Sequence, residues 1–134
     1  MTTAADNAAL ARRFIAALEA GTTGDALAAF FHDDVEQHEL PNRLVAEGAR
    51  RDRAALLSSA EKGQKVLRSQ RYEVLNVVAE GDHVAVEMRW RGELAIPLGA
   101  LKPGDTIGGQ FAFFLEVREG RIHRIRNYDC YDPF

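Results

Sequence analysis

The sequence has a single cysteine, no long apolar run and no excess of basic residues. With Cys130 alone, a disulfide within the chain is excluded. No apolar segment approaches the roughly 20 residues that cross a membrane, and MTTAADNAALARR has no apolar core of the secretory type. A net charge of −3 argues against a surface built for nucleic acid or anionic lipid. We therefore expect a cytoplasmic protein.

What is present is an ordinary globular composition. The 134 residues are 46% hydrophobic and 28% charged, as in many soluble domains. No linker, internal repeat or low-complexity tract divides the chain. We expect one domain over residues 1–134.

The strongest pattern lies near the C-terminus, in the segment GQFAFFLEV. Phe111, Phe113, Leu115 and Val117 alternate onto one face, and the opposite face also carries apolar side chains. This favours a central strand with both faces covered. Glu119-Gly120 then supplies a hairpin turn.

The returning segment RIHRIRNYDCYD predicts the partner strand of this hairpin. The spacing of Ile122 and Ile125 breaks strict alternation, which a bulge near His123-Arg124 would explain. Beyond the bulge, one face of the strand carries Ile125, Asn127, Asp129 and Tyr131. If this face lines the hollow of a curved sheet, an amide, a carboxylate and a phenol project into an otherwise apolar cup.

The N-terminal half predicts helices followed by a strand. Asp6 or Asn7 is expected to cap a helix that ends at Gly21, and a shorter helix is expected over 25–31. In HDDVEQHELP, alternation places Gln37 and Glu39 together and His38 on the opposite face.

The segment GARRDRAALLSSAEKG predicts a further helix, with the basic run at its start exposed to solvent. Strands follow over KVLRSQRYEVLNVVAEGD and HVAVEMRW, and residues 92–108 predict a loop. This order of elements indicates an α+β domain in which a curved antiparallel sheet wraps N-terminal helices as an open cone.

Three segments resemble the nuclear transport factor 2 superfamily, in its SnoaL-like and ketosteroid-isomerase-like branch. They are RRFIAALEAG, ALAAFFHDDVEQHE and GRIHRIRNYDCYDPF. The resemblance implies a cone-shaped cystatin-like roll. It implies no single activity, because such folds serve isomerases, cyclases, dehydratases and proteins without catalysis.

The resemblance also places the family's functional residues. The isomerase base falls on Glu39, and its oxyanion-binding tyrosine falls on Phe14, which has no proton to donate. The protonated aspartate of the isomerases falls near Ala112 or Phe113. These two losses argue against the usual steroid isomerase. The acid/base aspartate of the cyclases falls on Asp129.

Three candidates for proton transfer follow. Glu39 in an apolar cup would have a raised pKa and act as base, unless it lies at a strand end in water. Asp129 would share a proton with it across the mouth, or instead pair with Arg124 or Arg126. His38 is the third candidate, because imidazole is a common general acid and base, but it needs a bulge to reach the cup and otherwise lies on the surface.

The remaining candidates would bind substrate. We expect this role for Asn127, Tyr131, Phe14, Gln37, Trp90 and Met88. Tyr72 and Tyr128 are interpreted as packing residues. No metal site is expected, because the His32 to His38 cluster diverges to both faces of a strand, and no cofactor motif is present.

These residues indicate cofactor-free proton transfer on a small hydrophobic molecule, as in isomerisation, cyclisation or dehydration. The alternative is a ligand carrier without catalysis. A second alternative is an interaction module, with a homodimer formed through the sheet face of Ala85, Glu87, Arg89 and Arg91.

Overall fold

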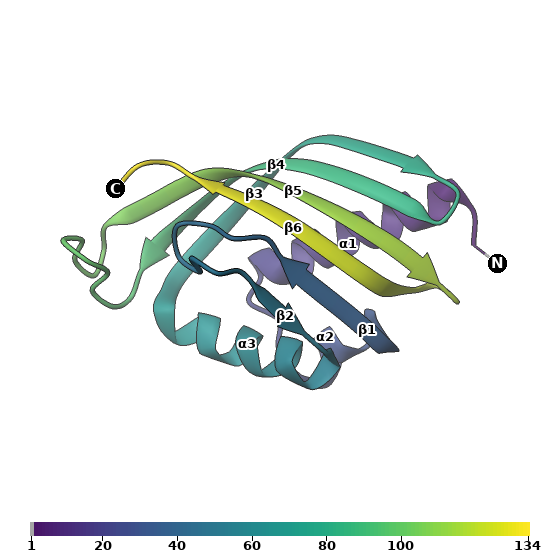
Figure 1. Cartoon of the computed structure of the whole chain (residues 1–134), viewed down its shortest axis with the longest axis horizontal. Helices are drawn as coiled ribbons and strands as arrows, with labels where there is room; N and C mark the ends of the chain where they lie inside the picture. Colours follow the sequence, from purple (N-terminus) through teal and green to yellow (C-terminus); the bar gives the residue numbers. More distant parts are fainter. Residues whose placement is uncertain (1) are drawn as a thin grey trace.

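A computed structural model describes residues 2–134 and contains three helices and six strands (Figure 1). The helices are α1 (Ala4–Glu19), α2 (Gly24–Ala28) and α3 (Arg53–Val66). The strands are β1 (Phe31–Glu39), β2 (Ala49–Arg51), β3 (Leu67–Glu80), β4 (His83–Leu94), β5 (Thr106–Arg118) and β6 (Arg121–Tyr131). Over the described residues, no helix is long and apolar enough to cross a membrane.

The six strands form one sheet in the order β2-β1-β6-β5-β4-β3. The α+β class is confirmed, but the sheet is mixed rather than antiparallel, because β1 runs parallel to β6. That pair joins the N-terminal and C-terminal parts of the chain. It places Glu39 opposite Asn127, so the two predicted functional segments meet.

Helix α1 begins earlier than the sequence predicted. Thr3 is the N-cap, and its side chain accepts a 3.0 Å hydrogen bond from the Asp6 backbone while Asp6 caps the Thr3 backbone in return. The predicted caps Asp6 and Asn7 therefore lie inside the helix. The buried Asn7 instead donates to the Gly81 carbonyl at 3.0 Å and ties α1 to the β3–β4 turn.

The C-terminal hairpin has the predicted turn and the predicted bulge. Glu119 and Gly120 both have positive φ, as a tight hairpin turn requires. Glu116 pairs with Arg124 and Val117 with Ile122, which leaves His123 as the extra residue on β6. The bulge restores the alternation that carries Asn127 and Asp129 on one face.

The segment before α3 differs from its prediction. Residues 49–51 form the edge strand β2, which pairs antiparallel with β1, and α3 begins only after Asp52 caps it. The short helix α2 also ends before its predicted limit, because Phe31 already starts β1. The predicted loop over 92–108 is shortened at both ends by β4 and β5.

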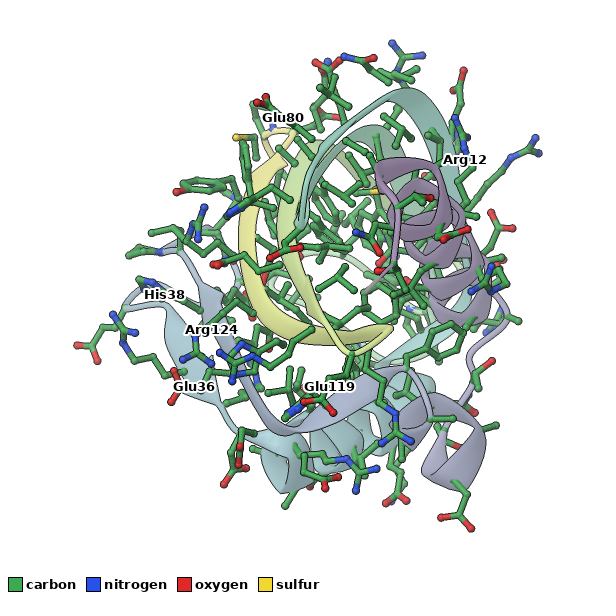
Figure 2. All side chains as sticks on the ribbon, turned by 90° about the vertical axis from the view of Figure 1, so that its right-hand side faces the viewer. Arg12, Glu36, His38, Glu80, Glu119 and Arg124 are labelled. Atoms are coloured by element: carbon green, nitrogen blue, oxygen red, sulfur yellow. The ribbon has the colours of Figure 1, made fainter. Side chains whose placement is uncertain are left out.

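The helices and the concave side of the sheet enclose the hydrophobic core. α1 packs on β3 and β4, and α3 packs on β1 and β2. The sheet curves around the side chains that fill its concave side, while Glu36, His38 and Arg124 lie outside it (Figure 2). The outer side has no second layer within residues 2–134: Phe114 is 39% exposed. The prediction of a central strand is confirmed, since β5 lies between β6 and β4, but the prediction that its outer face is covered is wrong for the single chain.

Candidate active site

A cavity of about 580 Å³ lies between the concave side of the sheet and the helices. Apolar side chains form most of its wall, a composition typical of small-molecule sites. A smaller polar set projects into it from β1, β2, β3 and β6, with members Gln37, Glu39, Arg51, Tyr72, Asn127, Asp129 and Tyr131.

The alternation of two strands brings this polar set together. β1 directs Gln37 and Glu39 to the concave side, and β6 directs Asn127, Asp129 and Tyr131 there. Because Gln37 pairs with Ile125 and Glu39 with Asn127, the two polar rows lie side by side. The predicted faces of both strands are confirmed.

Asp129 is the least satisfied carboxylate of the cavity. Its Oδ2 accepts a 3.1 Å hydrogen bond from Asn127 Nδ2, whereas its buried Oδ1 has no partner among the described residues. Burial raises the pKa of Asp129 to about 6, and the charge of Glu39 adds to this, although Asn127 and Arg51 act against it. Such a group is a base and an acid near neutral pH.

Glu39 is held by two partners. Arg51 Nη1 lies 2.8 Å from Oε1, and Asn42 Nδ2 donates to Oε2 at 2.7 Å. Glu39 is 8% exposed, so it is not the solvated strand-end residue of the alternative interpretation. Because both of its oxygens are engaged, Glu39 is less available than Asp129 to take a proton from a substrate.

Arg51 is a site residue that sequence reasoning missed. The sequence predicts that Arg51 lies in the solvent-exposed start of a helix. In the structure Arg51 belongs to β2, and its side chain lines the cavity. The only signal was its phase with Gln37 and Glu39, which requires knowledge of the β1–β2 pairing.

Two tyrosines supply hydroxyl donors near Asp129. Burial and the charge of Asp129 raise the pKa of both Tyr72 and Tyr131 above the ordinary tyrosine value. Both phenols therefore stay protonated at any physiological pH. Tyr131 was predicted to bind substrate, and Tyr72 was assigned to packing alone.

An aromatic wall faces these polar groups. Trp90 stacks on Phe111 with ring centroids 5.1 Å apart, and Tyr131 meets both rings edge-on. Gly92 makes room for the indole, since a Cβ there would lie 2.7 Å from Trp90 Cζ2. The wall is therefore made of flat aromatic rings.

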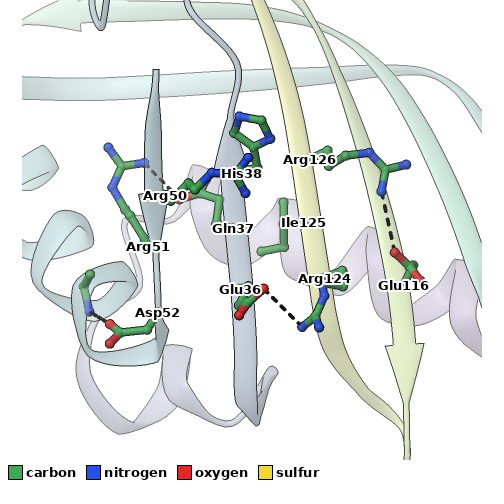
Figure 3. Close-up of a pocket in the computed structure, with 11 residues that line it drawn as sticks. Glu36, Gln37, His38, Arg50, Arg51, Asp52, Glu116, Arg124, Ile125 and Arg126 are labelled. Carbon is green, nitrogen blue, oxygen red and sulfur yellow. Dashed lines mark hydrogen bonds and ion pairs between the residues drawn. The ribbon is translucent and has the colours of Figure 1, made fainter. Parts of the chain in front are cut away.

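The structure separates the remaining predicted residues. Trp90 and Phe14 line the cavity, whereas Met88 is wholly buried in the core and is not part of the cavity wall. His38 faces away from Glu39, into a separate outer hollow with Arg50 and Arg126 (Figure 3). β1 pairs with β2 in unbroken register over residues 37–39, and this alternation keeps His38 on the outer side.

Among residues 2–134, no cluster of three or more histidine, cysteine, aspartate or glutamate side chains could hold a metal ion. The inner cavity combines one ion pair, one partly free carboxylate and neutral donors. That set can move a proton and hold an oxygen atom of a bound molecule.

Comparisons with known proteins agree on one family and one fold. The SnoaL-like domain matches residues 11–125. No curated protein matches the chain. AclR, a proposed hydroxylase from Streptomyces galilaeus, is 17% identical over 98% of this chain and 83% of its own, with a TM-score of 0.79.

Two further solved structures share the fold. A proposed polyketide cyclase from Xanthomonas campestris is 25% identical over 95% of this chain and 92% of its own, with a TM-score of 0.74. A protein with a ketosteroid-isomerase-like fold from Catenulispora acidiphila was solved in complex with trimethylamine. It is 20% identical over 89% of this chain and 83% of its own, with a TM-score of 0.70.

Proposed function

This chain belongs to the SnoaL-like family, and on that premise we propose that its cavity catalyses cofactor-free proton transfer on a small hydrophobic molecule. The reaction class is removal of a proton next to a carbonyl group, as in isomerisation, cyclisation or dehydration. The fold alone does not select this activity, so the proposal rests on the side chains of the cavity.

The observation that carries the proposal is the state of Asp129. Its pKa is raised to about 6, and its Oδ1 has no partner among the described residues. In the mechanism that we propose, Oδ1 takes a proton from the carbon next to the carbonyl. The electron pair of that C–H bond forms a C=C bond while the π pair of the C=O bond moves to the oxygen, and Asp129 later returns the proton to a carbon of the product as the C=O bond re-forms.

The developing oxyanion needs hydrogen-bond donors, and we assign them to Tyr131 and Tyr72. Both line the cavity, and the charge of Asp129 helps to raise the pKa of both. They would replace the two donors that the family isomerases carry at the places of Phe14 and Ala112 or Phe113 in this chain. Preorganised donors of this kind contribute roughly 10²–10³-fold each.

Proton exchange tests this proposal without knowledge of the natural substrate. The probe is 2-tetralone, a flat ketone whose α-protons exchange with D₂O and are followed by proton NMR. We expect the wild-type protein to accelerate exchange and Asp129→Asn to lose the acceleration. Glu116→Gln, which changes a carboxylate on the outer side of β5, is the matched control. Equal rates in all three proteins would contradict the proposal.

A second candidate function is binding of a hydrophobic amine without turnover. The favouring observation is the aromatic wall of Trp90, Phe111 and Tyr131 beside a carboxylate oxygen, since cations bind both aromatic faces and carboxylates. A related fold was solved with trimethylamine. Calorimetric titration with trimethylamine separates the candidates: saturable binding lost in Asp129→Asn supports an amine site, and absence of heat contradicts it.

We also propose that the protein forms a homodimer through the outer side of the sheet. Phe114 and Tyr128 pair there with ring centroids 5.7 Å apart, and both are about 40% exposed. Sedimentation of wild type and Phe114→Glu tests this. A dimer mass that falls to the monomer mass in the variant supports the interface, and a monomeric wild type contradicts it.

A further inference from the structure

Four side chains from three strands form one continuous series of hydrogen bonds across the cavity floor. Arg51 Nη1 donates to Gln37 Oε1 at 2.9 Å. Gln37 Nε2 donates to Asn127 Oδ1 at 2.8 Å, and Asn127 Nδ2 donates to Asp129 Oδ2 at 3.1 Å. The series therefore connects the edge strand β2 to the carboxylate of the proposed reaction.

Chemistry fixes the direction of this series from its Arg51 end. A guanidinium group only donates hydrogen bonds, so the side chain of Gln37 must turn its oxygen toward Arg51. The amide nitrogen of Gln37 then faces Asn127, which must present its oxygen. The amide nitrogen of Asn127 is left to face Asp129.

Burial keeps the series from reversing. Asn127 is 4% exposed, so water does not replace a partner that it loses. Turning either amide over would bring two N–H groups or two oxygens together at hydrogen-bond distance. Each such contact leaves a buried polar group unsatisfied, which is more costly than the loss of an exposed hydrogen bond.

We propose that Arg51 is a positioning residue that acts through Gln37 and Asn127 to reserve Asp129 Oδ1 for the molecule in the cavity. Oδ2 always accepts the Asn127 amide, so the exchangeable proton of Asp129 resides on Oδ1. The catalytic consequence rests on the proposed function, whereas the fixed order of hydrogen bonds does not.

A simpler role for Arg51 would be to neutralise Glu39, to which the same Nη1 donates at 2.8 Å. Gln37→Met and Arg51→Met together separate the two roles. Gln37→Met keeps the Arg51–Glu39 ion pair and the net charge, and it removes the link between Arg51 and Asn127. If Arg51 acted only on Glu39, the Asn127 amide would respond to Gln37→Met, which removes its own partner, but not to Arg51→Met.

The experiment uses NMR on the intact protein and needs no substrate. The first readout is hydrogen–deuterium exchange of the Asn127 side-chain amide, and the second is the titration midpoint of the Asp129 carboxyl carbon. Wild type is compared with Gln37→Met and Arg51→Met. Arg50→Met is the matched control, because Arg50 is the neighbouring arginine of β2 on the outer side.

We expect the Asn127 amide to exchange about tenfold faster in Gln37→Met and Arg51→Met, because its neighbour no longer fixes its orientation. The Asp129 midpoint should move to higher pH in both, since a freed Asn127 donates less to the carboxylate. Arg50→Met should match wild type. A variant that only loosened packing would lower thermal stability and leave the midpoint in place.

Two results would overturn the proposal. One is a folded Gln37→Met or Arg51→Met protein whose Asn127 amide exchanges at the wild-type rate. The other is an Arg50→Met protein that shifts both readouts as much as Arg51→Met does. Because the readouts are side-chain signals, a protein that fails to exchange 2-tetralone protons still tests the hydrogen-bond order.

Discussion

Arg51 and Glu39 form an ion pair at 2.8 Å that joins the edge strand β2 to the end of β1 inside the cavity. Only 20% of the Arg51 side chain and 11% of the Glu39 side chain are exposed. Breaking a buried pair from one side leaves the other charge without compensation, which destabilises the fold. The pair therefore holds the floor of the site in place.

Glu39→Ala should lower the free energy of unfolding by about 3 kcal/mol, because Arg51 stays buried without its partner. Urea denaturation measures this. Glu36→Ala is the control on the same strand: its side chain is 67% exposed and pairs with Arg124 at 3.7 Å, so its loss should cost under about 1 kcal/mol. Equal losses in both variants would contradict a structural role for the Arg51–Glu39 pair.

Asp129 should make the stability of the protein depend on pH. Its pKa is raised from 3.8 to about 6 by folding, so the folded state holds a proton that the unfolded state releases between these values. Its contribution is favourable below about pH 4 and is lost as pH rises through 6, for a total of about 3 kcal/mol.

Urea denaturation of wild type and Asp129→Asn at pH 4 and pH 7.5 checks this dependence. The wild type should lose stability relative to the variant as the pH rises, because asparagine does not ionise. A difference between the two proteins that is the same at both pH values would show that Asp129 has an ordinary pKa.

Gly92→Ala should disturb the aromatic wall. The new Cβ would lie 2.7 Å from Trp90 Cζ2, so the indole must move off Phe111 at a cost of about 1–3 kcal/mol. Tryptophan fluorescence reports the movement, since Trp90 is the single tryptophan of the sequence. Gly63→Ala in α3 meets no atom within 4 Å and should stabilise the protein by about 0.5–1 kcal/mol.

Tyr131→Phe should lower the rate of proton exchange about 10²-fold without a matching change in substrate binding, because a donor to the oxyanion acts mainly in the transition state. Kinetics with 2-tetralone measure both quantities. Tyr128→Phe changes a tyrosine three residues earlier that is 40% exposed on the outer side, and it should keep the wild-type rate. A rate unchanged in Tyr131→Phe would remove that hydroxyl from the mechanism.

The sequence predicted those parts of the site that depend on strand alternation. A period of two is a local property, and it placed Gln37 with Glu39 and Asn127 with Asp129 before any contact was known. The bulge at His123 was also readable, because the isoleucine spacing on either side breaks that period.

The parts that escaped prediction depend on contacts between distant segments. β2 is three residues long, and Ala49, Arg50 and Arg51 have no preference for a strand, so only pairing with β1 makes them one. The parallel pairing of β1 with β6 likewise cannot be predicted from the sequence of either strand alone. Arg51 was missed for this reason, and the roles of Glu39 and Asp129 could not be separated without it.

The most direct test of the central claim is the dependence of kcat/KM on pH for the ring opening of 5-nitrobenzisoxazole, which reports removal of one proton by a base. For wild type we expect a rate that rises with pH to a plateau, with a midpoint near 6 that reflects Asp129. Asp129→Asn should lose about 10²–10⁴-fold. Glu39→Gln should keep the rise to a plateau, with a midpoint at lower pH, because the charge of Glu39 helps to raise the pKa of Asp129. A folded Asp129→Asn protein with the wild-type profile, or a Glu39→Gln protein that alone loses it, would contradict the account.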